Sequence, residues 1–329
     1  MASYWGMAID SSRNRTEERR SAAALALRTR GRRGPARPRG DVVRLISRGW
    51  LAVLALAGAC SGPAHRDASE RVAGGLRQLK AGDSAAALAV FDSILTEDTT
   101  NAAAYRARGF LHQTAGRYDR AIQDYDHAIA NNRRYAIAYN NRGFTYQLEG
   151  KYTRAVADYD SALALNPALP VAIANRGRAQ FYLGQFDRAA ADLGKALQRD
   201  STNAFLAVWL HIVRMRMGAG DSSELARAVA RTDSARWPAP VAQFYLGKLT
   251  EPALDAAASK GDARAQQLQR CGAAFYAGEL LLWTKKLEAA TEHLERAKSI
   301  CPADASEAHG AAAELGRMAS TARVTPARE

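Results

Sequence analysis

Small and apolar residues along residues 102–169 follow a pattern that repeats after 34 positions. Residues 102–135 read AAAYRARGFLHQTAGRYDRAIQDYDHAIANNRRY, and residues 136–169 read AIAYNNRGFTYQLEGKYTRAVADYDSALALNPAL. Each copy holds two runs in which such residues return every three or four positions, with a glycine between the runs. This spacing predicts two amphipathic helices joined by a tight turn.

The spacing that the two copies share also predicts how the two helices of a unit pack. Glycine at position 8 and alanine at positions 20 and 27 permit a close approach, and large residues at positions 17 and 24 fill the remaining space. Glycine at position 15 supplies a left-handed turn that ends the first helix. The matched residues are Tyr105 and Tyr139, Gly109 and Gly143, Gly116 and Gly150, Tyr118 and Tyr152, Ala121 and Ala155, Tyr125 and Tyr159, and Ala128 and Ala162.

Further units begin in the same phase, and residues 68–203 hold four regular copies. The starting residues are Ala68, Ala102, Ala136, Pro170 and Ala204. The pattern is distorted over residues 204–270, where His211 replaces the glycine of position 8. Within this region Gly247 fits position 8 of a short unit that starts at Pro240.

The pattern returns in residues 271–304, with Lys285 in the place of the turn glycine. Residues 305–318 predict a capping helix, which the end of a repeat array requires, and residues 319–329 predict a frayed tail.

The unit resembles the tetratricopeptide repeat (TPR), a helix-turn-helix unit that stacks into a solenoid. The resemblance implies an all-α TPR superhelical solenoid of about seven helix-turn-helix units with a C-terminal capping helix. A chain rich in alanine and poor in aromatic residues suits closely crossing helices better than a sheet.

The resemblance also places a ligand groove on the concave face, which the first helix of each unit lines. The side chains that map onto it are Arg106, Phe110, Gln113, Asn140, Phe144, Gln147, Arg178 and Phe181. Such a mixture of aromatic, amide and guanidinium groups can stack on apolar side chains and hydrogen-bond a peptide.

Charged residues recur with the repeat. Arg120, Arg154 and Arg188 each precede an aspartate (Asp124, Asp158 and Asp192) by four residues, which predicts salt bridges along one helix face. A second row, Arg108, Arg142 and Arg176, stands just before the position-8 glycines. Their repetition in successive units indicates a role in unit stacking.

The net charge of +13 is concentrated near the start of the chain. Residues 1–48 carry 12 arginines and four acidic residues, a net charge of +8, which leaves +5 for the rest. Residues 1–41 lack apolar periodicity and are expected to be disordered. Two interpretations of this basic segment stay open, a start codon assigned upstream of Val42 or Val43 and a genuine basic arm that binds phosphates.

Residues 42–59 predict a signal peptide. Arg44 and Arg48 precede an apolar run that is too short to span a bilayer, and small residues lead up to Cys60. The sequence LAGAC resembles the lipobox of bacterial lipoproteins, which implies lipid modification of Cys60, followed by a linker over residues 60–67. Cleavage after Ala59 without a lipid is the alternative.

An exported chain permits disulfides. Cys271 and Cys301 stand at positions 1 and 31 of one unit, where the start of its first helix meets the end of its second, so a disulfide between them is predicted. Two separate thiols are the alternative.

The six histidines show no ligand spacing, so no metal site and no cofactor are expected. The sequence shows no phosphate-binding loop and no nucleophile motif, so a non-enzymatic protein is predicted.

The order of signal, cysteine, early repeats, distorted segment and late repeat resembles the NlpI-type lipoproteins. That resemblance implies a periplasmic adaptor on the outer membrane that brings proteases or peptidoglycan enzymes together, often as a homodimer. Without a lipid the protein is expected in the soluble periplasm. The alternative is a cytoplasmic TPR module whose basic arm binds acidic partners or nucleic acid.

Overall fold

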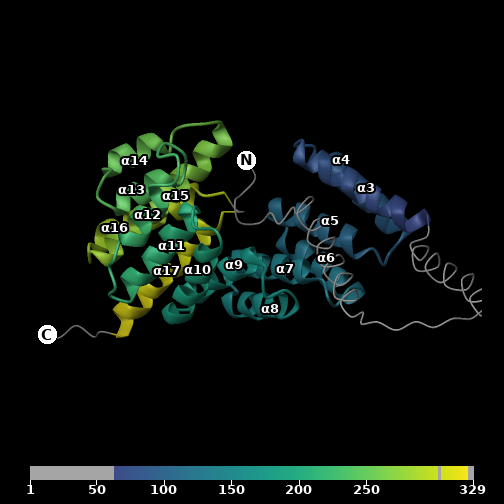
Figure 1. The fold of residues 1–329 in the computed structure, drawn as a ribbon, viewed down its shortest axis with the longest axis horizontal. Coiled ribbons are helices and arrows are strands. Elements are labelled where there is room, and N and C mark those ends of the chain that lie inside the picture. Colours follow the sequence, from purple (N-terminus) through teal and green to yellow (C-terminus); the bar gives the residue numbers. More distant parts are fainter. Residues whose placement is uncertain (1–62, 303–304, 325–329) are drawn as a thin grey trace, which may run out of the picture. The chain divides into compact units, whose positions relative to one another are not determined.

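A computed structural model describes residues 63–302 and 305–324 (Figure 1). The basic segment 1–41, the signal peptide 42–59, Cys60 and the last five residues lie outside the described part of the chain. Of the described residues, 63–94 belong to one compact unit and 95–324 to another.

The described residues form fifteen helices and no strand, so the predicted all-α repeat fold is confirmed. Seven consecutive helix pairs are followed by one last helix. The first three pairs are α3 (Pro63–Lys80) with α4 (Ser84–Glu97), α5 (Ala102–Thr114) with α6 (Tyr118–Asn131), and α7 (Ala136–Leu148) with α8 (Tyr152–Leu165). The next two are α9 (Pro170–Tyr182) with α10 (Phe186–Arg199), and α11 (Ala204–Arg216) with α12 (Ser223–Val229). The chain continues through α13 (Ala239–Tyr245), α14 (Glu251–Ala257), α15 (Ala263–Trp283), α16 (Leu287–Ile300) and α17 (Ser306–Val324).

Local sequence signals set the ends of the regular helices. Asn101 caps α5 by accepting a hydrogen bond from the Ala104 amide at 3.0 Å. The turn glycines Gly116, Gly150 and Gly184 have φ near +72°, a conformation that residues with a Cβ rarely adopt. The short turns keep the two helices of each pair antiparallel (Figure 1).

Contact between positions 8 and 24 holds each pair together. A Cβ on Gly109 would lie 2.9 Å from the Tyr125 ring, and a Cβ on Gly177 would lie 2.9 Å from Leu193. Both distances are shorter than real Cβ contacts, so only glycine permits this approach.

The distorted region corrects one part of the predicted register. Gly247 has φ of +68° and directly follows α13, so it ends a helix and does not occupy position 8 within one. The prediction for Gly247 is therefore wrong. Glycine is typical of both position 8 and the turn at position 15, and the short α13 brings the turn to Gly247. Lys285 does occupy the turn position, with φ of +61°. Helix α15 begins at Ala263, ahead of the predicted unit start at Cys271.

The charged ladders are also arranged differently from the sequence prediction. Arg142 donates to Asp158 through Nε and Nη2 at 2.8 and 2.7 Å, and to Asp126 of the preceding unit through Nη1 at 2.6 Å. Arg176 makes the same contacts one unit later, with Asp192 and Asp160.

The predicted pairing of the aspartates with Arg120, Arg154 and Arg188 is therefore wrong, because arginines on the neighbouring helix take the aspartates. A two-pronged contact of a half-buried arginine is stronger than an exposed pair along one helix. The contacts to the preceding unit bear out a role in stacking.

The core of residues 95–324 is centred on α11, which is buried along almost its whole length. The fully buried Trp209 ring packs against Phe181 and Phe275, with centroids 5.6 and 5.8 Å away. Helix α17 follows α16 and also contacts α7, α9 and α15 (Figure 1). None of the described helices combines the length and the apolar character needed to cross a bilayer.

We expect Gly143→Ala to destabilise the protein by about 1–3 kcal/mol, because its Cβ would lie 3.0 Å from the Tyr159 ring and 3.1 Å from the Ala155 carbonyl oxygen. Gly194→Ala is the matched control, since that helical glycine has open space around it. It should raise the free energy of unfolding by about 0.5–1 kcal/mol. Urea unfolding followed by circular dichroism measures both, and equal changes would contradict the packing role of position 8.

Candidate functional site

The candidate site is the inner face formed by the first helices of successive units, α5, α7 and α9. Of the eight side chains assigned to it from the sequence, only Arg106 is partly exposed. The buried ones are Phe110, Gln113, Asn140, Phe144, Gln147, Arg178 and Phe181. Their contact with a peptide stays a prediction, and their burial shows that they also pack the repeat.

The two glutamines connect neighbouring elements. Gln113 Oε1 accepts hydrogen bonds from Tyr125 Oη at 3.1 Å and from Thr145 Oγ1 at 3.0 Å. Gln147 Oε1 accepts from Tyr159 Oη at 3.1 Å. Each glutamine thus gives a hydrogen-bond acceptor to the hydroxyl of the buried tyrosine at position 24.

On α5 two residues at groove positions, Arg106 and Thr114, reach the surface. Arg106 donates through Nε to Tyr135 Oη at 2.8 Å, and its guanidinium lies 5.9 Å from the Tyr135 ring centroid. Thr114, at the end of α5, is exposed. A planar cation held over an aromatic ring offers a peptide both a stacking surface and N–H donors.

Helix α17 lies against α7 and α9, and it also touches the first residues of α6 and α8. Tyr152 Oη donates to the carbonyl oxygen of His309 at 3.1 Å, and the His309 ring meets the Tyr118 ring edge-on at 6.5 Å. Arg317 Nη1 donates to the carbonyl oxygen of Tyr182, the last residue of α9, at 2.6 Å. The last helix of the chain therefore occupies part of the surface that the repeat pattern assigns to a ligand.

A group of buried charges lies where α11, α15 and α17 meet. Arg216 Nη2 lies 3.0 Å from Glu279 Oε2 and 2.9 Å from Glu314 Oε2, and Glu314 also pairs with Arg317. Both glutamate side chains are almost fully buried. One arginine therefore links two carboxylates that would otherwise repel each other.

The surroundings of Glu279 change the pKa of its carboxyl group. Burial, and then the negative charge of Glu314, raise the pKa of Glu279 to about 8, against the opposing effect of Arg216. Glu279 Oε1 has no hydrogen-bond partner among the described residues. Glu279 therefore keeps its proton to a higher pH than an exposed glutamate does, which relieves the repulsion.

The sequence reasoning missed this charge cluster. Glu279 stands at position 9 of the unit that begins at Cys271, and Arg216 stands at position 13 of the unit that begins at Ala204. Both are groove positions. A glutamate and an arginine at groove positions of different units could therefore have indicated an ion pair between these units. That Glu314 would join them could not be read from the repeat, because α17 lies outside it.

Cys271 and Cys301, the pair for which the sequence predicts a disulfide, are bonded in the structure, with the sulfur atoms 2.08 Å apart. The bond joins α15 to the residue that directly follows α16. Closing a loop of this length is worth about 3 kcal/mol or more in the chain-entropy model.

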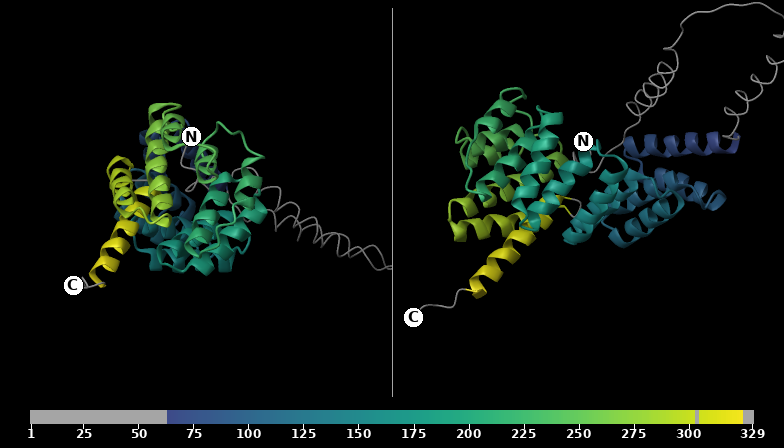
Figure 2. Two further views of the ribbon diagram at one scale, coloured as in Figure 1. Left: turned by 90° about the vertical axis from the view of Figure 1, so that its left-hand side faces the viewer. Right: turned by 60° about the horizontal axis from the view of Figure 1, so that its bottom comes forward.

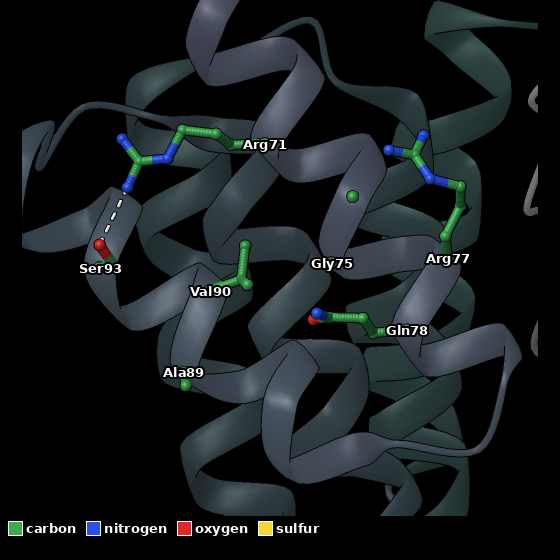
Figure 3. A pocket seen from close by; sticks show the side chains of 8 residues that line it. Arg71, Gly75, Arg77, Gln78, Ala89, Val90 and Ser93 are labelled. Carbon is green, nitrogen blue, oxygen red and sulfur yellow. Dashed lines mark hydrogen bonds between the residues drawn. The ribbon is translucent and has the colours of Figure 1, made fainter.

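A separate hollow of about 570 Å³ lies on the first helix pair (Figure 3). It is lined by Arg71, Gly74, Gly75, Arg77, Gln78, Ala89, Val90 and Ser93. Gly74 and Val90 stand where the next unit carries Arg108 and Asp124, which form a two-pronged ion pair. The first pair therefore lacks this ion pair, and Gly74 leaves open the space that an arginine side chain fills in the next unit.

Within residues 63–302 and 305–324, no group of three or more His, Cys, Asp or Glu side chains is arranged to hold a metal ion.

Comparison with known proteins places the repeat in a family. Residues 136–169 match the family model of the tetratricopeptide repeat. The chain therefore carries tetratricopeptide repeats, as the recurring unit predicted, and such repeats mediate protein–protein interaction. No curated protein matches the chain.

Solved structures with a similar fold include a tetratricopeptide repeat protein from Parabacteroides merdae, at 18% identity and a TM-score of 0.47, over 71% of this chain and 93% of that one. PilW, a type IV pilus biogenesis factor, matches at 19% identity and a TM-score of 0.46, over 70% and 92% of the two chains. The first TPR of Spaghetti bound to an HSP90 peptide matches at 25% identity and a TM-score of 0.36, over 37% and 96%.

We expect Glu279→Gln to stabilise the protein increasingly as pH rises. The folded-state pKa is about 8, whereas an unfolded glutamate titrates near about 4.3. The stability that the proton on Glu279 provides is therefore complete below about pH 4 and is lost as pH rises to about 8. Glutamine does not titrate, and it can still accept a hydrogen bond from Arg216.

Urea unfolding at about pH 5 and about pH 8 measures the difference between variant and wild type, which should grow with pH. Glu288→Gln, at an exposed position of α16, is the control and should show no such growth. A pH-independent difference for Glu279→Gln would contradict the buried, neutral carboxyl.

Proposed function

We propose that the protein is an exported, non-enzymatic scaffold that binds peptide segments of cell-envelope proteins on the inner face of its tetratricopeptide units. The observation that carries this proposal is the surface at α5, where Arg106 lies over Tyr135 and Thr114 is exposed. Folds built from such repeats are typically scaffolds, and their inner helices offer a continuous row of side chains to an extended or helical peptide.

The proposed location rests on the sequence before residue 63. The apolar run after Arg44 and Arg48 and the small residues before Cys60 support export and a lipid on that cysteine. The protein is then held at the periplasmic face of the outer membrane, or is soluble in the periplasm if no lipid is added. Resemblance to the NlpI-type lipoproteins suggests envelope proteases or peptidoglycan enzymes as partners, and a homodimer.

The basic segment supports a second candidate function. The 12 arginines of residues 1–48 could instead hold acidic partners or nucleic acid if the chain stays in the cytoplasm. The compartment therefore decides between the two functions.

For the location, we expect Cys60→Ser to move the protein from the membrane fraction to the soluble fraction, because a serine cannot carry the thioether-linked lipid. The intact mass of the mature wild-type protein should correspond to a chain that begins at Cys60 and carries the lipid. A wild-type protein that retains residues 1–59 and is soluble in the cytoplasm would support the alternative function.

For the binding surface, we expect a photo-crosslinking residue at Thr114 to form adducts with envelope proteins in cells. The same residue at Gln123, on an exposed part of α6, is the matched control and should form none. Gel electrophoresis and mass spectrometry identify the adducts. Equal labelling at both positions, or none at either, would contradict binding at the inner face.

A further inference from the structure

Helix α17 is seated on the inner face as a ligand would be. It contacts α7 and α9, the first helices of two regular units, in addition to α15 and α16. Two hydrogen bonds to its neighbours involve backbone carbonyl oxygens, one from Tyr152 to His309 and one from Arg317 to Tyr182. The structure therefore shows one helix that this surface accepts, and its contacts define the chemistry of a suitable partner.

The side of α17 that meets the surface must be small. Gly310 and Ala311 are buried, and a Cβ on Gly310 would lie 2.5 Å from Tyr182 Oη and 2.9 Å from the Phe275 ring. A larger side chain at this position would displace the helix or force both rings to move. The surface thus selects a glycine at the point of closest approach.

Two charged residues on the same helix provide polar anchors. Glu314, four residues after Gly310, pairs with Arg216 of α11 at 2.9 Å. Arg317, three residues later, donates to the Tyr182 carbonyl oxygen at the C-terminus of α9, where unpaired carbonyl oxygens attract a cation. Spacings of four and three residues place all three groups on one face of a helix.

Helix α17 is nevertheless a weak occupant. Its larger apolar side chains, Leu315 and Met318, are only partly buried. Beneath it Tyr182 Oη and Glu279 Oε1 are buried without hydrogen-bond partners among the described residues. An unsatisfied buried polar group is destabilising, and buried ion pairs return little net stability. Both views of Figure 2 show the last turns of α17 projecting beyond the other helices.

The disulfide marks where α17 can separate from the rest. Cys301 follows α16 directly and is bonded to Cys271 in α15, so the end of α16 stays fixed to its partner helix. When α17 separates, this bond still joins the end of α16 to α15.

We propose that α17 is a displaceable occupant of the inner face, and that the partner which replaces it is a helix with glycine, then glutamate four residues later, then arginine three residues after that. This proposal rests on the proposed function, since it takes the inner face to be the binding surface. It adds the class of ligand, a helical segment, and the internal competitor that the ligand must displace.

The test uses the full-length chain and a fluorescein-labelled peptide with the sequence of residues 305–324. In Gly310→Leu the bulky side chain should eject the chain's own α17 and free the surface. We expect this variant to bind the peptide about tenfold or more tightly than wild type, because the wild-type surface is occupied most of the time. Fluorescence anisotropy gives the dissociation constants.

Ala312→Leu is the matched control, because Ala312 is an exposed residue of the same helix. It should bind the peptide as wild type does, and a peptide carrying leucine in place of the residue that corresponds to Gly310 should bind none of the proteins. Arg317→Gln gives a second route, since it removes an anchor without inserting bulk, and it should also bind more tightly than wild type. Circular dichroism and thermal unfolding show that each variant is folded.

Equal affinity of folded Gly310→Leu, Arg317→Gln and wild type for the peptide would overturn the proposal, and so would the absence of binding to all of them. These outcomes are distinct from failure of the proposed function, which Thr114 crosslinking in cells tests without α17. Adducts at Thr114 together with no peptide binding would leave the scaffold function in place and reject α17 as the model of its ligand.

Discussion

The close approach of two helices at glycine is the constraint on which the repeat depends. At Gly109, Gly143 and Gly177 there is no room for a Cβ, because a tyrosine or leucine from position 24 of the second helix fills the space. This contact sets the separation of the helices within a pair. It also fixes which side chains of the first helix face the next unit and which face inward, so the inner surface is a consequence of it.

Polar contacts add direction to this packing. Arg142 and Arg176 each join an aspartate of their own unit to one of the unit before, so the same side chain closes the pair and sets the stacking. Where Gly74 replaces this arginine, in the first described pair, a hollow remains (Figure 3). The residue at position 7 of the unit thus decides between an ion pair, when it is arginine, and a hollow, when it is glycine.

The inner face consists of regular repeat helices together with α17, which is not part of the repeat. Its tyrosines and glutamines satisfy one another within the repeat, as Tyr125 and Gln113 do. The buried charges around Arg216 and Glu279 instead depend on α17 for a further carboxylate. Burying such charges costs free energy, so the cluster adds little net stability, and this supports the proposal that α17 can be displaced.

The local structure follows from the 34-residue period, which predicts the helix pairs, the turn glycines and the role of position 8, because these depend on neighbours close along the chain. The same period also brought Cys271 and Cys301 together, because they lie at matching ends of one unit. Three features depend instead on how distant segments pack: Asp124 pairs with Arg108 and not Arg120, Phe181 is buried, and α17 contacts α9. Pairing and exposure depend on which distant segment arrives at a surface, and a repeat period carries no information about a helix that lies outside it.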